Sequence, residues 1–227
     1  MKERPILFSA PMVRAILEGR KTQTRRVITL KSSILRAGPT ATYRMMPEGD
    51  ALLERWPIQD RMMNNFGRCE RVKCPYGVPG DRLWVKENWI PVHFGSYEPI
   101  ERGEHIPHYP DSIQYAADTI HGYHTCWDTY PGKWRSSLFL ARWMSRITLE
   151  ITDVRVQRIQ DISEEDARAE GIHQVLEPNT FELEEPYKST IHKRRFSHVW
   201  DFINAKRGYG WDVNPWCWCI SFKPAEV

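Results

Sequence analysis

The hydrophobic pattern near the N-terminus predicts a short strand followed by a short helix. Residues 6–8 form an apolar run of strand length. Pro11 suits the first turn of a helix, and Met12, Ile16 and Leu17 fall on one face of that helix. The basic segment GRKTQTRR follows, and it continues into residues rich in β-branched side chains, which favour a second strand.

Two patterned stretches in the middle of the chain predict further strands and a helix. Residues 78–89 begin with the turn signal Pro-Gly-Asp and then alternate as a strand does. Residues 145–159 alternate most regularly, as in one long strand or a bent pair of strands. Ser163 and Asp166 have the spacing of a capping box, so a helix is expected to begin there and to end at Gly171.

The last two patterned stretches are an amphipathic helix at 192–208 and a strand at 216–222. Three long segments show no periodicity and are predicted to be loop insertions. These are residues 31–77, 91–135 and 173–189. Because strands and helices do not alternate regularly, we predict the α+β class, and the pattern suits a small barrel with insertions better than a layered parallel sheet.

We expect a single domain over residues 1–227, with a core made of the patterned segments. The core segments are about 5–30, 78–90, 140–172 and 190–223.

Composition points to a soluble globular protein in a reducing, cytoplasmic setting. Hydrophobic residues make up 41% of the chain and charged residues 27%, which are ordinary values. No apolar run approaches the roughly 20 residues that span a bilayer, so no membrane association is expected. The N-terminal segment is interrupted by Pro11 and Arg14 and is unlike a signal peptide. The five cysteines are odd in number and do not suit a disulfide framework.

Positive charge is concentrated in local clusters, since the net charge is only +3. The clusters are residues 20–26, residues 192–195 and the pair Arg142 and Arg146. Each cluster could contact phosphate groups or could form a solvated face, and the sequence leaves both interpretations open.

Two residues in this pattern suggest catalysis. A neutral lysine amine near a threonine hydroxyl makes an activated nucleophile, and Lys21 and Thr24 are close in sequence. Burial and neighbouring arginines would lower the pKa of Lys21. A solvated basic edge is the alternative interpretation of the same residues.

Glu170 lies in the last turn of a predicted helix, where the helix dipole disfavours a carboxylate. A nearby cation such as Lys21 would hold Glu170 in place, although the carboxylate would then raise the lysine pKa. A solvated surface glutamate is the other possibility. The sequence does not decide which effect on the lysine dominates.

The segment GRKTQTRR resembles the G-x-K-x-x-E-x-R signature of ASCH domains, which are small PUA-like barrels. Gly19, Lys21 and Arg26 match the signature, and Thr24 occupies the glutamate position. The segments PGDRLWVKE and ISEEDARAEGI resemble other parts of the family, and the whole chain resembles ASCH-domain proteins carried by phages and prophages. The resemblance implies a PUA-like (ASCH) β-barrel flanked by short helices, with long loop insertions.

The threonine variant of the motif is similar to that of small bacterial ASCH proteins that hydrolyse N4-acetylcytidine. This resemblance implies a nucleophile at Thr24, a base at Lys21 and a partner at Glu170. It further implies an amidohydrolase that acts on N4-acylated cytosine nucleosides. The insertions have no counterpart in those shorter proteins, so a non-catalytic RNA- or DNA-binding module of a phage or prophage, or a ribonuclease, is the alternative function.

Five further residues are predicted to bind substrate: Gly19, Arg20, Arg26, Trp84 and Arg142. Arg26 or backbone N–H groups near Gly19 would stabilise an oxyanion. Trp84 would stack on a base, with core packing as the alternative. Arg142 would contact a phosphate.

The expected partners are a nucleoside substrate and, in the alternative, RNA or single-stranded nucleic acid. No cofactor or metal is predicted, since the Cys69/Cys74 and Cys217/Cys219 pairs have spacings unlike those of zinc sites. The sequence leaves the oligomeric state open.

Overall fold

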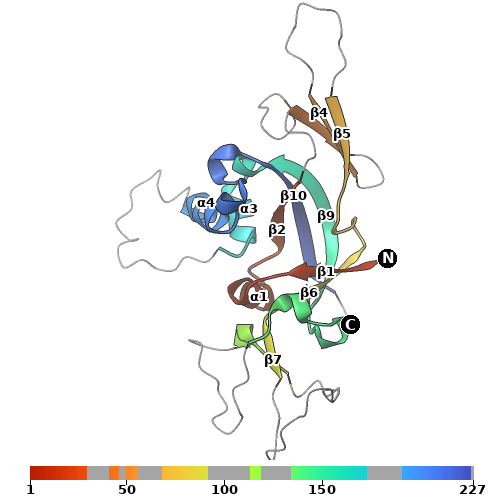
Figure 1. Ribbon diagram of the computed structural model, residues 1–227, viewed down its shortest axis with the longest axis vertical. Coiled ribbons are helices and arrows are strands. Elements are labelled where there is room, and N and C mark those ends of the chain that lie inside the picture. The colour runs from red at the N-terminus through yellow and green to blue at the C-terminus, as the bar shows by residue number, and fades with distance from the viewer. Residues whose placement is uncertain are drawn as a thin grey trace, which may run out of the picture.

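A five-stranded mixed sheet forms the centre of the protein (Figure 1). The computed structural model describes residues 1–29, 41–45, 50–55, 68–91, 113–118, 134–172 and 191–225. The strand order is β1-β6-β9-β10-β2, in which β1 pairs with β6 in parallel and the other pairs are antiparallel. The bounds are β1 Glu3–Leu7, β2 Gln23–Val27, β6 Arg82–Lys86, β9 Thr148–Arg158 and β10 Trp216–Pro224.

Alternating side chains bury both faces of this sheet. In β10, Trp218 and Ile220 enter the main core together with Leu83 of β6 and Leu149 of β9. Cys217 points to the other side, into a second cluster of apolar residues. The sheet is therefore covered on both faces, which explains why five consecutive residues of β10 are buried.

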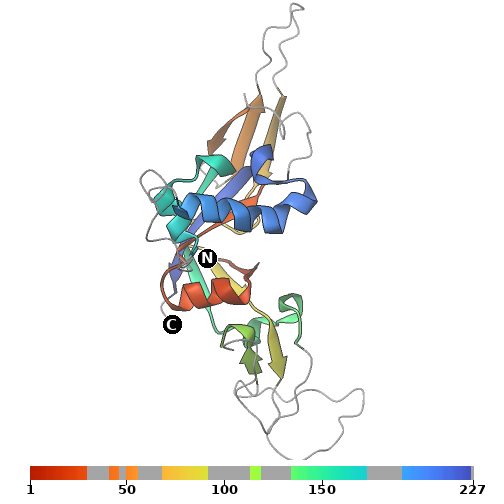
Figure 2. The same ribbon diagram turned by 90° about the vertical axis from the view of Figure 1, so that its left-hand side faces the viewer.

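In the described part of the chain, three α-helices flank the sheet: α1 Ala10–Leu17, α3 Glu164–Ala169 and α4 Ile191–Asn204. Helices α3 and α4 lie side by side on the same side of the sheet (Figures 1 and 2). Phe196 and Trp200 of α4 are one helical turn apart, and both pack with Ala167 of α3 in the second cluster. The amphipathic pattern predicted for 192–208 thus corresponds to a helix that buries one face on α3 and the sheet.

Six short 3-10 helices are described, and they occupy the connections. They are η2 Ala116–Asp118, η3 Ser137–Phe139, η4 Arg142–Met144, η5 Ile159–Asp161, η8 Ala205–Arg207 and η9 Trp211–Val213.

Among the described residues, two further small sheets lie wholly or partly in segments that were predicted to be loop insertions, and the second also takes residues 89 and 90 of the predicted core. A three-stranded antiparallel sheet has the order β3-β4-β5, and β7 pairs with β8. Their bounds are β3 Ala41–Met45, β4 Asp50–Arg55, β5 Arg68–Lys73, β7 Trp89–Pro91 and β8 Ile113–Tyr115. The prediction of loop throughout 31–77 and 91–135 is therefore wrong at these strands. The sequences DALLER and RCERVK lack a period of two, so hydrophobic alternation could not reveal β4 and β5. ATYRM of β3 does alternate, and the prediction of loop overlooked it.

The two small sheets lie at opposite ends of the long axis of the molecule (Figures 1 and 2). The predicted insertion 173–189 lies outside the described residues, as do most of 31–77 and 91–135.

The mixed α and β content of the predicted class is confirmed, with an almost entirely antiparallel central sheet. Among the described strands, β1 and β2 are the two edges of that sheet and do not pair with each other. Closure into a PUA-like barrel therefore stays a prediction. None of the helices in the described part of the chain has the length and apolar character needed to cross a membrane.

Candidate active site

Backbone hydrogen bonds join the start of β2 to the end of α3. Gly19 ends α1 with a positive φ of 72°, and the N–H of Lys21 then donates to the Ala15 carbonyl at 2.9 Å. Lys21 and Glu170 form an isolated antiparallel bridge, and the N–H of Thr22 donates to the Ala169 carbonyl at 2.9 Å. The basic segment and the C-terminal end of α3 are therefore held together before any side chain contributes.

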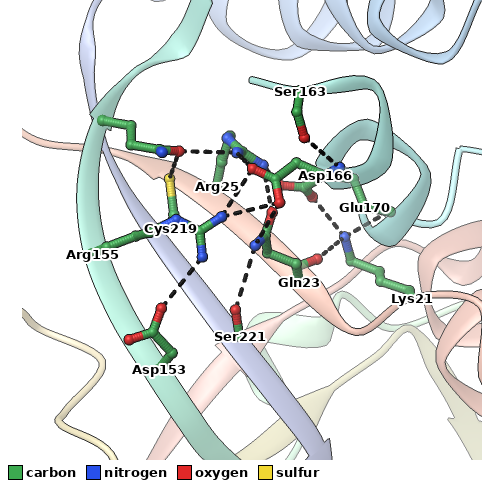
Figure 3. A network of polar contacts seen from close by, with 11 residues as sticks. Lys21, Gln23, Arg25, Asp153, Arg155, Ser163, Asp166, Glu170, Cys219 and Ser221 are labelled. Carbon is green, nitrogen blue, oxygen red and sulfur yellow. Dashed lines mark hydrogen bonds and ion pairs between the residues drawn. The ribbon is translucent and has the colours of Figure 1, made fainter. Parts of the chain in front are cut away.

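The Lys21 side chain is almost completely buried and is surrounded by acceptors (Figure 3). Its Nζ donates to the Gln23 carbonyl, the Glu170 carbonyl and the Glu170 Oε2 atom, each at 2.8 Å. An ammonium has three N–H donors, so these contacts satisfy the charged form. Glu170 is also buried, and its contact with Lys21 is an ion pair.

Burial lowers the pKa of Lys21 below its ordinary value. The charge and hydrogen bond of Glu170 act in the opposite direction, and the charges of Arg26 and Arg25 add to the lowering. The sequence left open whether burial or the Glu170 carboxylate dominates the pKa of Lys21. In the structure burial dominates, and the pKa is lowered. Lys21 is a base that loses its proton more readily than a solvated lysine does.

Arg25 extends the polar network from Glu170 to the sheet (Figure 3). Its Nη1 donates to the Gln23 Oε1 atom at 2.6 Å and to the Glu170 Oε1 atom at 3.4 Å. Its Nη2 donates to the Asp166 Oδ2 atom at 2.7 Å, and Arg155 donates to the same carboxylate at 2.9 Å. Glu170 is thus fixed between two buried cations, which holds its carboxylate in one orientation.

The N-terminus of α3 differs from the predicted capping box in one respect. Ser163 accepts a hydrogen bond from the N–H of Asp166 at 3.0 Å, as expected of the cap residue. The Asp166 carboxylate does not complete the box, because it is bound by Arg25 and Arg155. The two arginines outweigh the effect of burial, and the pKa of Asp166 is lowered.

A cavity of about 270 Å³ lies next to Lys21 and Glu170. Thr24 is 4% exposed and forms part of its wall, as does Arg26, two residues further along β2. The three acceptors of Lys21 do not include the Thr24 hydroxyl. The two side chains therefore share a cavity, and Lys21 is held by Glu170 and the backbone.

Four aromatic side chains line the same cavity: Phe8, Tyr76, Phe196 and Trp200. Phe8 also lies under two cations, with its ring centre 5.6 Å from Lys21 Nζ and 5.2 Å from Arg26 Cζ. A cavity with aromatic walls and a few charged groups suits a flat, partly polar ring.

The other predicted substrate-binding residues are divided between this cavity and other parts of the surface. Arg26 lines the cavity, and its Nη2 donates to the Leu7 carbonyl at 2.6 Å. Gly19 and Arg20 do not line it, and Arg20 pairs with Glu18 on the surface.

Trp84 and Arg142 also lie away from the cavity. The Arg142 Cζ atom is 6.0 Å from the centre of the Trp84 ring, and Arg142 forms an ion pair with Glu3 at 2.8 Å. Neither residue is among those that line the cavity, so the structure does not bring them together with Lys21. Trp84 is half-buried on the face of β6 opposite the core.

Sequence reasoning missed the contribution of α4 and η8 to the cavity. Phe196, Trp200, Asn204 and Arg207 all line it. The spacing of four between Phe196 and Trp200 predicts a buried helix face, but the spacing does not identify what that face covers.

Within the described residues, no group of three or more His, Cys, Asp and Glu side chains could hold a metal ion. Cys217 and Cys219 are buried, and burial raises the pKa of Cys219 to about 12. A thiol with such a pKa is a poor metal ligand and a poor nucleophile at neutral pH.

Gly171 gives a direct test of how closely α3 packs on the basic segment. Its φ is +79°, and a Cβ atom there would lie 2.8 Å from Lys21 Cβ and 2.9 Å from Ala15 Cβ. We expect Gly171→Ala to lower the free energy of unfolding by about 2–3 kcal/mol, from backbone strain and overpacking together. Urea denaturation measures this change.

Gly19→Ala is the matched control, because Gly19 has a similar φ of +72° with no atom within 4 Å of the added Cβ. It should lose only about 1 kcal/mol, from the left-handed backbone conformation. Equal losses for the two variants would contradict the close packing around Gly171.

No protein-family model matches the sequence, and a search of curated proteins gives no match. One solved structure to which the chain is similar is the ASCH domain from Lactobacillus crispatus JV V101. The identity is 13% and the TM-score is 0.34, over 98% of this chain and 79% of that chain.

Proposed function

We propose that this protein is an amidohydrolase that removes the acyl group from N4-acetylcytidine and related N4-acylated cytosine nucleosides. One observation carries the proposal: a buried lysine with a lowered pKa, paired with a carboxylate, shares a small aromatic cavity with a buried threonine. The cavity volume of about 270 Å³ is near the lower end of small-molecule pockets, which are roughly 300–1,000 Å³. The resemblance of GRKTQTRR to the motif of N4-acetylcytidine hydrolases adds the substrate class.

In the proposed first step, neutral Lys21 accepts the proton of the Thr24 hydroxyl. A neutral amine keeps two N–H donors for its present acceptors and gains a lone pair that can accept this proton. The Thr24 oxygen forms a bond to the amide carbon, and the bond from that carbon to the exocyclic nitrogen breaks. The nitrogen takes the proton from Lys21, so cytidine leaves as the neutral amine and the acyl group remains on Thr24 as an ester.

In the second step, water attacks the ester carbon and gives its proton to Lys21. The carbon–oxygen bond to Thr24 breaks, the acid leaves, and the proton returns to Thr24. Each time Lys21 becomes an ammonium, it regains three acceptors at hydrogen-bond distance, two of them on Glu170. Glu170 is therefore assigned as the residue that orients Lys21 and stabilises its charged form, and Arg26, which lines the cavity, as the group that stabilises a developing oxyanion.

The alternative, a non-catalytic nucleic-acid-binding module, has less support in the arrangement of the cations. Lys193 donates to the Gln160 carbonyl at 2.7 Å, and Arg142 pairs with Glu3. Arg146 pairs with Glu87 and Asp118 at 2.9 and 2.8 Å. Much of the predicted basic surface is thus used in contacts within the protein. No observation favours a ribonuclease.

The test is the release of cytidine from N4-acetylcytidine by the purified protein, followed by chromatography over a range of pH. Because Lys21 must be neutral to act as the base, kcat should rise with pH through the lowered pKa of Lys21 and level off above it. The midpoint of the rise should therefore lie below the ordinary lysine pKa of about 10.4.

Lys21→Met is the matched variant for this pH profile, since it removes the amine and keeps a chain of similar length. It should lose turnover at every pH. A rate that rises with pH in the same way in the variant and in the wild type would contradict the assignment of Lys21.

A further inference from the structure

The residues that line the cavity change from buried near Lys21 to exposed near the end of α4. Lys21, Thr24 and Glu170 are each 4% exposed, so the proposed reactive groups lie at the floor. Ile203 is 56% exposed, and Arg207 is also exposed, so the end of α4 and η8 form part of the rim. A ligand whose reactive group reaches the floor must therefore extend its other end toward the end of α4 and η8.

Cations predominate over carboxylates around this cavity. Its lining includes Lys21, Arg25, Arg26, Arg207 and a single carboxylate, Glu170. A cavity lined by an excess of one charge attracts ligands of the opposite charge. The cavity therefore favours an anionic ligand over a neutral one.

The cations differ in the partners they already have. Lys21 and Arg25 are bound to Glu170, and Arg26 donates to the Leu7 carbonyl and stacks on Phe8. The Arg207 side chain forms no hydrogen bond or ion pair with any residue in the described part of the chain. It ends η8 beside Gly208, whose φ is +80°, at the rim of the cavity.

We propose that Arg207 binds a phosphate group on the ribose of the substrate, so that the protein acts on N4-acylated cytosine nucleotides in preference to free nucleosides. This inference rests on the proposed function for the identity of the base. In such a nucleotide the N4 amide and the 5′-phosphate lie at opposite ends, which matches a reactive floor and a cationic rim. Arginine binds phosphate through two parallel N–H donors, and Lys206 adds a second exposed cation next to it.

The test measures binding of the deacylated products, so that it does not depend on turnover. Calorimetry compares cytidine 5′-monophosphate with cytidine for the wild type and for Arg207→Ala. We expect the wild type to bind the monophosphate about tenfold more tightly than cytidine, and Arg207→Ala to lose most of this preference while keeping its affinity for cytidine. Arg194→Ala removes an exposed cation of α4 that does not line the cavity, and it should leave the preference unchanged.

A third ligand separates the two sources of a ribose phosphate. A cytidine-containing trinucleotide that binds more tightly than the monophosphate would assign Arg207 to a phosphodiester of a polymer, and the reverse order would assign it to a free nucleotide. Equal affinity of the wild type for cytidine and both phosphorylated ligands would overturn the inference. So would an equal loss of cytidine and monophosphate binding in Arg207→Ala.

The outcome is independent of the proposed reaction. A monophosphate preference that depends on Arg207, found in a protein that releases no cytidine from N4-acetylcytidine, would retain the phosphate site and reject the amidohydrolase. Turnover of the nucleoside and its 5′-monophosphate with equal kcat/KM would retain the amidohydrolase and reject the phosphate site.

Discussion

Replacing Glu170 with glutamine is expected to lower the free energy of unfolding by about 3–5 kcal/mol. Glu170 is 4% exposed, and its carboxylate contacts Lys21 Nζ at 2.8 Å and Arg25 Nη1 at 3.4 Å. Removing its charge leaves two buried cations without their shared anion, which is more costly than losing the hydrogen bonds alone. Urea denaturation at neutral pH measures the loss.

Two comparisons separate this effect from a general weakening of α3. Glu165→Gln changes an exposed glutamate of the same helix and should alter stability by no more than about 0.5 kcal/mol. Combining Glu170→Gln with Lys21→Met also removes the Lys21 charge, while Arg25 keeps its ion pair with Asp166, so the double variant should recover part of the lost stability. A Glu170→Gln variant as stable as the wild type would contradict the account of the Lys21–Glu170 pair as a buried ion pair.

Replacing Thr24 with alanine is expected to lower kcat/KM for N4-acetylcytidine by at least about 10³-fold. Thr24 is the nucleophile of the proposed reaction, and attack by water without Thr24 keeps only the binding and oxyanion contributions to the rate. Thr24→Ser keeps a hydroxyl at the same position and should retain much more activity than Thr24→Ala. Initial rates of cytidine release measure both effects.

Thr22 supplies the control on the same segment of chain. Thr22 is exposed and does not line the cavity, and its backbone N–H and carbonyl groups bond to Ala169 and Phe222. Thr22→Ala should therefore hydrolyse the substrate at the wild-type rate. A Thr24→Ala variant that keeps more than about a tenth of the wild-type rate would show that Thr24 is not the nucleophile.

Local sequence patterns predicted the segments that form the centre of the fold. Pro11 and Gly19 mark the ends of α1, and Ser163 marks the start of α3, because capping depends on residues close together in the chain. The contact between Glu170 and Lys21 could be anticipated, because the position of each charge is electrostatically unfavourable without a partner of opposite charge. A carboxylate at a helix C-terminus and a lysine among arginines each gain from an opposite charge.

The same reasoning could not predict which distant elements share one cavity. Trp84 and Arg142 have the right chemistry for a base and a phosphate, but β6 turns Trp84 away from the core side, toward η4. Arg207 carries no local signal that distinguishes it from other exposed cations. Its place at the rim depends on how α4 packs across α3, which is set by contacts between residues far apart in sequence.

The strands β3 to β5 were missed for a different reason. Backbone pairing holds β3, β4 and β5 together, and Met45, Ala51 and Val72 contact the main core, one residue from each strand. Such isolated core contacts produce no run of alternating apolar residues in β4 and β5. The register of Ala41 against Arg55 and of Asp50 against Lys73 is therefore a property of the folded chain that the sequence pattern did not reveal.

The measurement that tests the central claim most directly is the release of cytidine from N4-acetylcytidine by the wild-type protein and by folded Thr24→Ala in parallel. The account predicts catalytic turnover by the wild type and at least about a 10³-fold slower release by the variant. Equal rates in the two proteins, or no release by either, would contradict the claim that this cavity hydrolyses an amide through Thr24.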